Sequence, residues 1–410
     1  MKTSLMDNIW KGVKVSCVAG MLLVISGCIP AQPIKTLASA PFLDSPTPLV
    51  SATPTSPTPT NTPTLTNLQT PAPTPALVVF PLPKAVPVED FPSPKTETMQ
   101  TGQLFNGTWT RYTAPEWLRL APQSGVSQDI TSIAEAPAGT FWFSTTGSGT
   151  DGGTGVYRFD GKTWTRFRQA NGLPLDEVFP IVAAPDGAIW FGSFCCGVTR
   201  YDEKSWTNYT TENGLPSDNV RSLTFAADGA LWVGTSDNGL ARFDGTGWQT
   251  YFGGRYAAPS FMLPNRTLLV STSDGGSAKL YQFNGQSWVN YPTPWMAAGK
   301  YTPAMAAAPN GDVWFATEFT YVYQLSVNTW TAYSLGTDNM IVSAAAARDG
   351  SIWFGTYAGA YRFDGKNWST FKPQGDSGNN WVGPILAASD GSIWLAYDGG
   401  IGHYVPPAAP

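Results

Sequence analysis

Side chains suited to nucleophilic, redox or metal chemistry are scarce in this chain. Its single histidine, His403, lies near the C-terminus, and one histidine cannot build a multi-histidine metal site. No cysteine pair has the spacing of a zinc ligand set, and no Gly-x-Ser-x-Gly nucleophile elbow occurs. We therefore predict no metal, no cofactor and no catalytic residue, and we interpret His403 as a structural strand residue.

Loop carboxylates offer one remaining route to hydrolytic chemistry, because a pair of Asp or Glu side chains can cleave a glycoside. Nothing in the sequence pairs two such residues across a site, and the loops of any soluble protein carry exposed acids. The sequence therefore favours a non-catalytic protein, and a polysaccharide-active hydrolase or lyase is the alternative. The candidate acids, all in loops predicted on one face, are Asp151, Asp176, Glu177, Asp237, Glu318 and Asp398.

The adjacent cysteines Cys195 and Cys196 occupy a loop where the corresponding loops have Gly or small polar residues. Outside the cell such a pair can close into a vicinal disulfide, whose eight-membered ring would form a rigid apolar platform. The alternative is two reduced or separately buried thiols. Redox catalysis is less favoured, because the Cys-x-x-Cys arrangement is missing. We predict a disulfide at this pair.

Aromatic side chains of the same predicted loops are candidate ligand contacts, because exposed rings beside polar groups stack on sugars or grip peptides. Trp295 and Trp381 have no counterpart in the repeat described below, which makes them the better candidates. Rings that merely plug a central channel are the alternative for these two residues. The full set of rings is Trp117, Trp295, Trp381, Phe319, Tyr321, Tyr357 and Tyr256, and Asp237, Glu318 and Asp398 are the polar ligand contacts predicted with them.

Composition indicates an all-β protein outside the nucleic-acid-binding classes. Aromatic residues make up 13% of the chain and charged residues 13%, with 42 Gly and 35 Pro, which is typical of short strands joined by tight turns. The formal net charge is -5, so there is no basic surface for DNA or RNA. A weakly acidic surface also disfavours binding to anionic lipid, so any membrane attachment must come from an anchor.

The N-terminus has the pattern of an export signal over residues 1–28. Lysines precede an apolar run from Val15 to Ser26, which is too short to span a bilayer comfortably. The run ends in Ile-Ser-Gly-Cys at 25–28, which resembles the bacterial lipobox. That resemblance implies that Cys28 carries the lipid and becomes the mature N-terminus; an uncleaved anchor helix or a conventional signal is the alternative. Residues 29–98, rich in Pro, Thr and Ser, are predicted to form a disordered stalk.

From residue 103 the sequence repeats about every forty residues, the length of a four-stranded propeller blade. One tryptophan series has seven positions, with Leu269 replacing Trp in the fourth: Trp142, Trp190, Trp232, Leu269, Trp314, Trp353 and Trp394. A second series follows at Trp164, Trp206, Trp248, Trp288, Trp330 and Trp368, and its seventh member, Trp109, stands far upstream. We predict that residues 99–410 form a seven-bladed β-propeller in which an N-terminal strand completes the last blade and removes the open edge.

The repeats resemble the two-component-regulator propeller repeat. Residues 228–235 read Asp-Gly-Ala-Leu-Trp-Val-Gly-Thr and residues 239–245 read Gly-Leu-Ala-Arg-Phe-Asp-Gly, close to that repeat's central pattern. The resemblance covers about residues 103–404. In that family such propellers often form extracytoplasmic sensor regions ahead of a transmembrane segment and a kinase, neither of which this sequence shows, so only the binding role is expected here.

These observations predict a non-catalytic, extracytoplasmic ligand-binding lipoprotein held at the membrane by its lipid anchor alone. A carbohydrate ligand is favoured slightly over a peptide. Besides the enzyme named above, the alternative is a scaffold that docks another protein of the cell envelope.

Overall fold

The computed structural model of the chain describes its repeat region and a few short segments before it. The described residues are 78–80, 86–87, 95–96, 107–113, 130–137, 139–145, 155–169, 173, 176–263, 266–273, 278–291, 293, 304–317, 321–326, 329–335, 340–373, 380–397 and 400–407. The predicted signal with Cys28 lies outside these residues, as do six of the loop candidates: Trp117, Asp151, Trp295, Glu318, Phe319 and Asp398. Within the described part, no helix is long and apolar enough to cross a bilayer.

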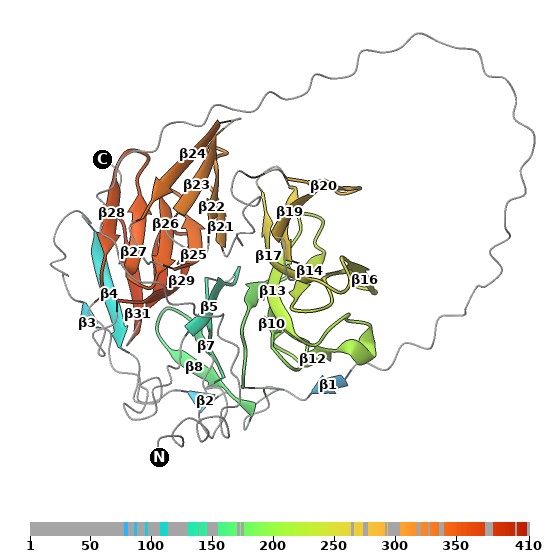
Figure 1. Cartoon of the computed structure of the whole chain (residues 1–410). Helices are drawn as coiled ribbons and strands as arrows, with labels where there is room; N and C mark the ends of the chain where they lie inside the picture. Colours follow the sequence, from blue (N-terminus) through green and yellow to red (C-terminus); the bar gives the residue numbers. More distant parts are fainter. Residues whose placement is uncertain are drawn as a thin grey trace, which may run out of the picture. The chain divides into compact units, whose positions relative to one another are not determined.

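The strands form seven antiparallel sheets (Figure 1). Each sheet contains one four-stranded blade, numbered here by the order of its innermost strand in the chain. Blade 1 comprises β5 (Ile130–Glu135), β6 (Phe141–Thr145), β7 (Val156–Phe159) and β8 (Trp164–Phe167). Blade 2 comprises β9 (Ile181–Ala183), β10 (Ile189–Gly192), β11 (Val198–Tyr201) and β12 (Trp206–Tyr209). Blade 3 comprises β13 (Val220–Phe225), β14 (Leu231–Thr235), β15 (Leu240–Phe243) and β16 (Trp248–Tyr251).

The remaining blades repeat this pattern. Blade 4 comprises β17 (Tyr256–Met262), β18 (Leu268–Ser273), β19 (Ala278–Phe283) and β20 (Trp288–Asn290). Blade 5 comprises β21 (Ala304–Ala307), β22 (Val313–Ala316), β23 (Tyr321–Ser326) and β24 (Thr329–Ser334). Blade 6 comprises β25 (Ile341–Ala346), β26 (Ile352–Thr356), β27 (Gly359–Phe363) and β28 (Trp368–Phe371). Blade 7 comprises β29 (Val382–Ala387), β30 (Ile393–Tyr397), β31 (Gly400–Val405) and β4 (Thr108–Thr113).

The innermost strands close a ring. Each contacts the innermost strand of the next blade, in the order β5, β9, β13, β17, β21, β25, β29 and back to β5. At the junction of blades 7 and 1, the amide of Ser389 donates a hydrogen bond of 2.7 Å to the carboxylate of Glu135. The predicted seven-bladed propeller is therefore confirmed.

The closing strand is β4, as predicted from the isolated Trp109. It pairs antiparallel with β31 from Thr108 opposite Val405 to Thr113 opposite Gly400, and the two strands lie side by side in Figure 1. Trp109 is 4% exposed and stacks on Phe371 of blade 6, with ring centroids 4.4 Å apart. The seventh blade thus joins residues from both ends of the repeat region.

Three short strands come from the range assigned above to the stalk. β1 (Val78–Phe80), β2 (Val86–Pro87) and β3 (Lys95–Thr96) pair with the outer strands β12, β8 and β4. They add a fifth strand to blades 2, 1 and 7, and they cover hydrogen-bonding edges that would otherwise be open.

The core lies between neighbouring sheets. The second strands of the blades are apolar on both faces, and the burial of β14 and β26 is continuous from end to end. A strand packed between two blades loses both faces to the interior, which explains why its apolar residues are consecutive. The first tryptophan series fills this space: all six of its tryptophans are at most 4% exposed.

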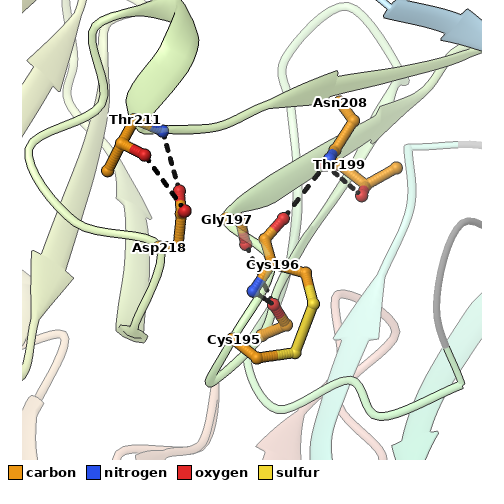
Figure 2. Close-up of a disulfide and its surroundings, with 8 residues drawn as sticks. Cys195, Cys196, Gly197, Thr199, Asn208, Thr211 and Asp218 are labelled. Carbon is orange, nitrogen blue, oxygen red and sulfur yellow. Dashed lines mark hydrogen bonds between the residues drawn. A yellow bond between two sulfur atoms is a disulfide. The ribbon is translucent and has the colours of Figure 1, made fainter.

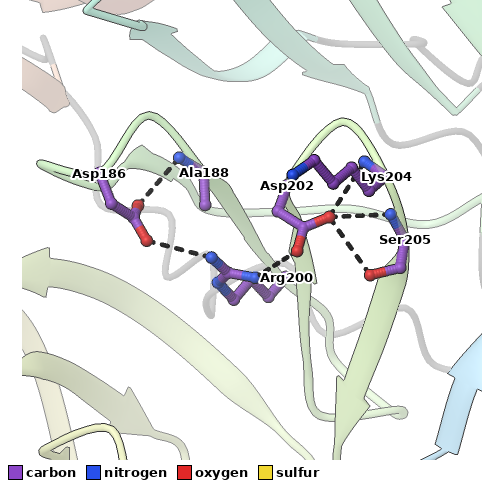
Figure 3. A network of polar contacts seen from close by, with 6 residues as sticks. All are labelled: Asp186, Ala188, Arg200, Asp202, Lys204 and Ser205. Atoms are coloured by element: carbon purple, nitrogen blue, oxygen red, sulfur yellow. Dashed lines mark hydrogen bonds and ion pairs between the residues drawn. The ribbon is translucent and has the colours of Figure 1, made fainter.

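The turns on one face are fixed by aspartates. We call this the lower face; it carries the turns between first and second and between third and fourth strands. Asp202 accepts hydrogen bonds from the backbone amides of Lys204 and Ser205, and Arg200 bridges it to Asp186 at 2.8 and 3.0 Å (Figure 3). The same turn-to-strand ion pair recurs in blades 3 and 6, as Asp228–Arg242 and Asp349–Arg362. These acids are therefore turn formers.

Acidification is expected to destabilise the propeller between about pH 4 and pH 2. Burial raises the pKa of Asp202, but the amides of Ser205 and Lys204 and the Arg200 side chain outweigh it and lower that pKa to about 2. An unfolded carboxyl has a pKa near 3.9, so the unfolded chain binds the proton first as the pH falls. After a discount for solvent screening, the ionised carboxylate of Asp202 contributes about 1 kcal/mol to the free energy of unfolding. This contribution is present above pH 4 and is lost near pH 2.

Calorimetric melting temperatures of Asp202→Asn and the native chain, measured from pH 7 to pH 2, test this expectation. Asn keeps the turn, because Asn284 accepts the same pair of amide bonds in blade 4. The melting temperature of Asp202→Asn should fall less below pH 4 than that of the native chain. The melting temperature of Glu203→Gln, a change at the neighbouring exposed position, should fall as much as that of the native chain. Parallel curves for Asp202→Asn and the native chain would contradict the assignment.

Candidate functional site

The cysteine pair lies in the loop between β10 and β11, on the face opposite the aspartate turns. We call this the upper face; it carries the loops between second and third strands and the connections between blades. The structure joins Cys195 to Cys196 by a disulfide (Figure 2). Ser193 accepts a 2.8 Å hydrogen bond from the Cys196 amide, and the Cys196 carbonyl accepts one of 3.3 Å from Asn208. The loop therefore holds the disulfide in one orientation.

The disulfide ring is open to solvent on its Cys195 side. Cys195 is exposed and Cys196 is partly buried, whereas the flanking Ser193 and Gly197 are buried. The loop is also tied to the next blade, because Gly197 donates a 3.0 Å backbone hydrogen bond to the carbonyl of Asp218. A rigid apolar surface consequently stands at the boundary of blades 2 and 3.

An aromatic and cationic cluster adjoins the disulfide in sequence and crosses the same boundary. The guanidinium of Arg221, from β13, lies 4.0 Å from the ring centroid of Phe194, and Phe179 packs against Phe194 at 4.5 Å. Arg221 also donates through Nε to the Ser236 hydroxyl, which hydrogen bonds Asn219 at 2.9 Å. Within the described residues, no acceptor is bonded to the terminal N–H groups of Arg221. We call Phe179, Phe194, Asn219, Arg221 and Ser236 the boundary cluster.

The loop carboxylates do not form a catalytic pair among the described residues. Asp218 accepts hydrogen bonds of 2.7 and 3.1 Å from the amide and hydroxyl of Thr211 (Figure 2), and Asp176 accepts from the amide of Gln169 at the equivalent place one blade earlier. Both are loop anchors of the repeat. Asp237 is exposed in the loop between β14 and β15, and Glu177 is exposed in the connection to blade 2.

Electrostatics give no sign of a general acid in the described part of the chain. Every aspartate there whose pKa departs from its ordinary value lies in a lower-face turn, and in each case the pKa is lowered. A catalytic carboxylic acid needs the opposite shift. The same residues contain no cluster of three or more His, Cys, Asp or Glu side chains that could hold a metal ion.

His403 lies in β31, where the sequence analysis expected a structural residue. It stacks on Trp394, with ring centroids 4.2 Å apart, and pairs with Thr110 of the closing strand. Burial lowers the pKa of His403, and the nearby charge of Asp390 acts in the opposite direction. The imidazole is therefore a packing element of blade 7.

The predicted aromatic contacts that are described come from separate blades. Tyr357, in the loop between β26 and β27 of blade 6, is 45% exposed. Tyr321 of blade 5, Tyr256 of blade 4 and Trp381 before β29 are partly buried. The outer edge of the Trp381 ring lies against Gly383, where a β-carbon would overlap it. Of these four residues, only Tyr357 is exposed.

Sequence reasoning missed the boundary cluster. Phe179, Phe194 and Arg221 belong to three different segments, and none departs from the repeat in a way that marks it. The available signal was their shared position: each lies beside an upper-face loop in two consecutive repeats.

Comparison with known proteins supports the fold. Residues 214–237 match the family described as two component regulator propeller. No curated protein matches the chain. Many solved structures resemble it. An inactive variant of virginiamycin B lyase from Staphylococcus aureus, solved with quinupristin, has a TM-score of 0.57 and 15% identity, over 73% of this chain and 99% of that one.

Two further structures resemble this chain to a similar extent. The extracellular domain of a hybrid two component system protein from B. thetaiotaomicron has a TM-score of 0.56 and 20% identity, over 70% of this chain and 42% of that one. YCF48 bound to D1 peptide has a TM-score of 0.54 and 14% identity, over 74% of this chain and 98% of that one. At these identities the likeness concerns the fold alone.

Proposed function

We propose that this chain is a non-catalytic binding module that acts outside the cytoplasm and recognises a carbohydrate on its upper face. The observation that carries the proposal is the exposed disulfide ring beside the boundary cluster. A rigid apolar surface suits the C–H face of a sugar ring, and polar groups around it fix the orientation.

The polar groups of the boundary cluster suit hydroxyl recognition. Arg221 offers its terminal N–H groups, and exposed Asp237 offers acceptor oxygens in a neighbouring loop. Sugar hydroxyls both donate and accept, so such a mixed set pairs with them better than a uniformly charged surface would. The stacking of Arg221 on Phe194 fixes the guanidinium in advance, which reduces the entropy lost on binding.

Three observations support a location outside the cytoplasm. The export signal predicted over residues 1–28 ends at Cys28, whose proposed lipid would anchor the chain to a membrane. The two component regulator propeller match and the fold shared with the extracellular domain of a two component system protein agree with that placement. The disulfide between Cys195 and Cys196 also agrees with an oxidising compartment, where such bonds form and persist.

A lyase role is less well supported than binding. The chain resembles virginiamycin B lyase in fold, but the only histidine here is stacked inside blade 7. Among the described residues of the upper face, no pair of carboxylates could take over a catalytic role from that histidine.

Binding of glycans and cell-wall fragments, followed by thermal shift and tryptophan fluorescence, tests the proposal. We expect one glycan class to bind. The variant Arg221→Gln, and separately the double variant Cys195→Ser with Cys196→Ser, should each weaken the affinity for that glycan by about tenfold or more, an effect of the size expected for loss of a charge-assisted hydrogen bond. Arg200→Gln, on the lower face of blade 2, is the matched control and should leave affinity unchanged.

Three outcomes would redirect the proposal. If peptides bind and no glycan does, the proposed ligand class changes from carbohydrate to peptide. Turnover of a bound glycan that one Asp or Glu substitution abolishes would establish the enzyme alternative. Glycan binding that survives both upper-face variants would place the site elsewhere.

A further inference from the structure

Blade 4 departs from the repeat at its lower-face turn. In the other six blades the turn between first and second strands has a glycine at positive φ, whose amide donates to the carbonyl three residues earlier. These glycines are Gly139, Gly187, Gly229, Gly311, Gly350 and Gly391. In blade 4 the equivalent residue is Arg266, at φ 66°, with its amide bonded to the Leu263 carbonyl. A left-handed backbone disfavours a side chain of this kind, so the arginine is conformationally costly.

Two neighbouring substitutions accompany Arg266. The turn carbonyl belongs to Leu263, whereas the six equivalent residues are alanines, and the first tryptophan of the repeat is Leu269. The ion pair between turn and third strand is also replaced, since Gln282 donates to the Thr267 hydroxyl at 3.1 Å. Blade 4 therefore carries a cation in its turn that the repeat pattern does not use.

Arg266 borders a cavity of about 290 Å³ between the lower-face turns of blades 3 and 4. Side chains of Trp232, Met262, Leu268 and Phe283 line it, with Ala226, Ala227 and Gly285 at the turns. Trp232 and Leu268 are each 1% exposed, so the cavity reaches the apolar space between the two sheets. Its volume is close to the lower end of the range typical of small-molecule sites.

The two charged residues of the lining are not equivalent. Asp228 is already bonded to Arg242 at 2.8 Å and to the amide of Ala230 at 3.0 Å. Arg266 is exposed, and no carboxylate of the described residues lies within ion-pair distance of it. Asp228 therefore already has a counter-charge, and Arg266 is the charged residue of the lining that has no ion-pair partner among the described residues.

We propose that this cavity is a second binding site, for a small ligand with an apolar, ring-sized body and a carboxylate that pairs with Arg266. The apolar body packs on Trp232, Met262 and Phe283, and the guanidinium holds the carboxylate at the mouth by charge-assisted hydrogen bonds. The site is separate from the upper face and does not depend on the function proposed there. It also accounts for a costly arginine at a position that glycine fills in every other blade.

The test uses the full chain with methyl-labelled methionine and 3-phenylpropanoate as the probe, with uncharged 3-phenylpropanamide beside it. We expect the carboxylate to shift the Met262 methyl resonance saturably at millimolar concentration, and the amide to bind about tenfold more weakly or worse. Arg266→Gly should cause the same loss for the carboxylate, and Met262→Leu assigns the resonance.

Arg266→Gly restores the residue that the other blades use, so its melting temperature should be at or above that of the native chain. A loss of binding in that variant therefore reports on the guanidinium and not on the fold. Arg348→Ala removes a lower-face cation from the turn of blade 6 and should leave the titration unchanged. Equal affinity for acid and amide, carboxylate binding that survives Arg266→Gly, or no saturable shift at all would overturn the proposal.

Discussion

Loss of the closing strand β4 is expected to unfold the whole propeller rather than to loosen one blade. Trp109 is almost fully buried; it stacks on Phe371, with ring centroids 4.4 Å apart, and packs at a tilt against Tyr404, with ring centroids 4.9 Å apart. Truncating a buried tryptophan to alanine costs about 3–5 kcal/mol, and native domains have only about 5–15 kcal/mol in total. Removing β4 altogether also exposes the hydrogen-bonding edge of β31 and opens the ring.

Urea unfolding of Trp109→Ala, and of chains that start at residue 99 or at residue 114, measures this effect. The chain from 99 should unfold cooperatively, whereas the chain from 114 should aggregate or lack a cooperative transition. A peptide spanning residues 103–113 should partly restore it. Trp248→Ala is the matched control, because Trp248 occupies the equivalent outer strand of blade 3 but is only partly buried. Equal losses for Trp109→Ala and Trp248→Ala would show that closure is not the critical contact.

The second large effect is expected at Gly197, directly after the disulfide. Its φ is 78°, and a β-carbon there would overlap the carbonyl oxygen of Tyr209 on the neighbouring outer strand. Backbone cannot move aside as a flexible side chain does. We expect Gly197→Ala to cost about 3 kcal/mol or more, the sum of left-handed strain and overpacking.

Gly187 supplies a control within the same blade. Its φ is 89°, but a β-carbon there meets nothing within 4 Å. Gly187→Ala should therefore cost only about 1 kcal/mol, from backbone strain alone. Denaturant titration of both variants separates strain from collision, and equal losses would refute the steric argument. The same collision occurs at Gly155, Gly239 and Gly359 in three other blades, so the result should extend to them.

Most of the fold was predictable because the sequence pattern of one blade recurs in each of the others. The two tryptophan series gave the blade count, and the upstream Trp109 gave the closure, which the pairing of β4 with β31 confirms. The short strands β1, β2 and β3 were not predicted. They lie among prolines and threonines without apolar alternation, and their pairing depends on edges supplied by blades far along the chain.

The candidate site was less accessible to sequence reasoning. The pair Cys195-Cys196 stands out by residue type, and the structure joins it by a disulfide. The contact of Arg221 with Phe194 depends on how two blades face each other, and no spacing rule encodes that geometry. For Asp176 the face of the propeller was predicted, but its role was not: its carboxylate accepts a hydrogen bond from the Gln169 amide and anchors the loop.

The pairing of β4 with β31 also sets an order of events in time. Ribosomes make β4 before any other strand of the seven blades, and its partner Gly400–Val405 last. Six blades can therefore form from local contacts as the chain emerges, while the seventh must wait until β31 has been made. Until then the strand that bears Trp109 has no partner to pair with, so a nascent or prematurely terminated chain exposes this tryptophan to aggregation and proteolysis.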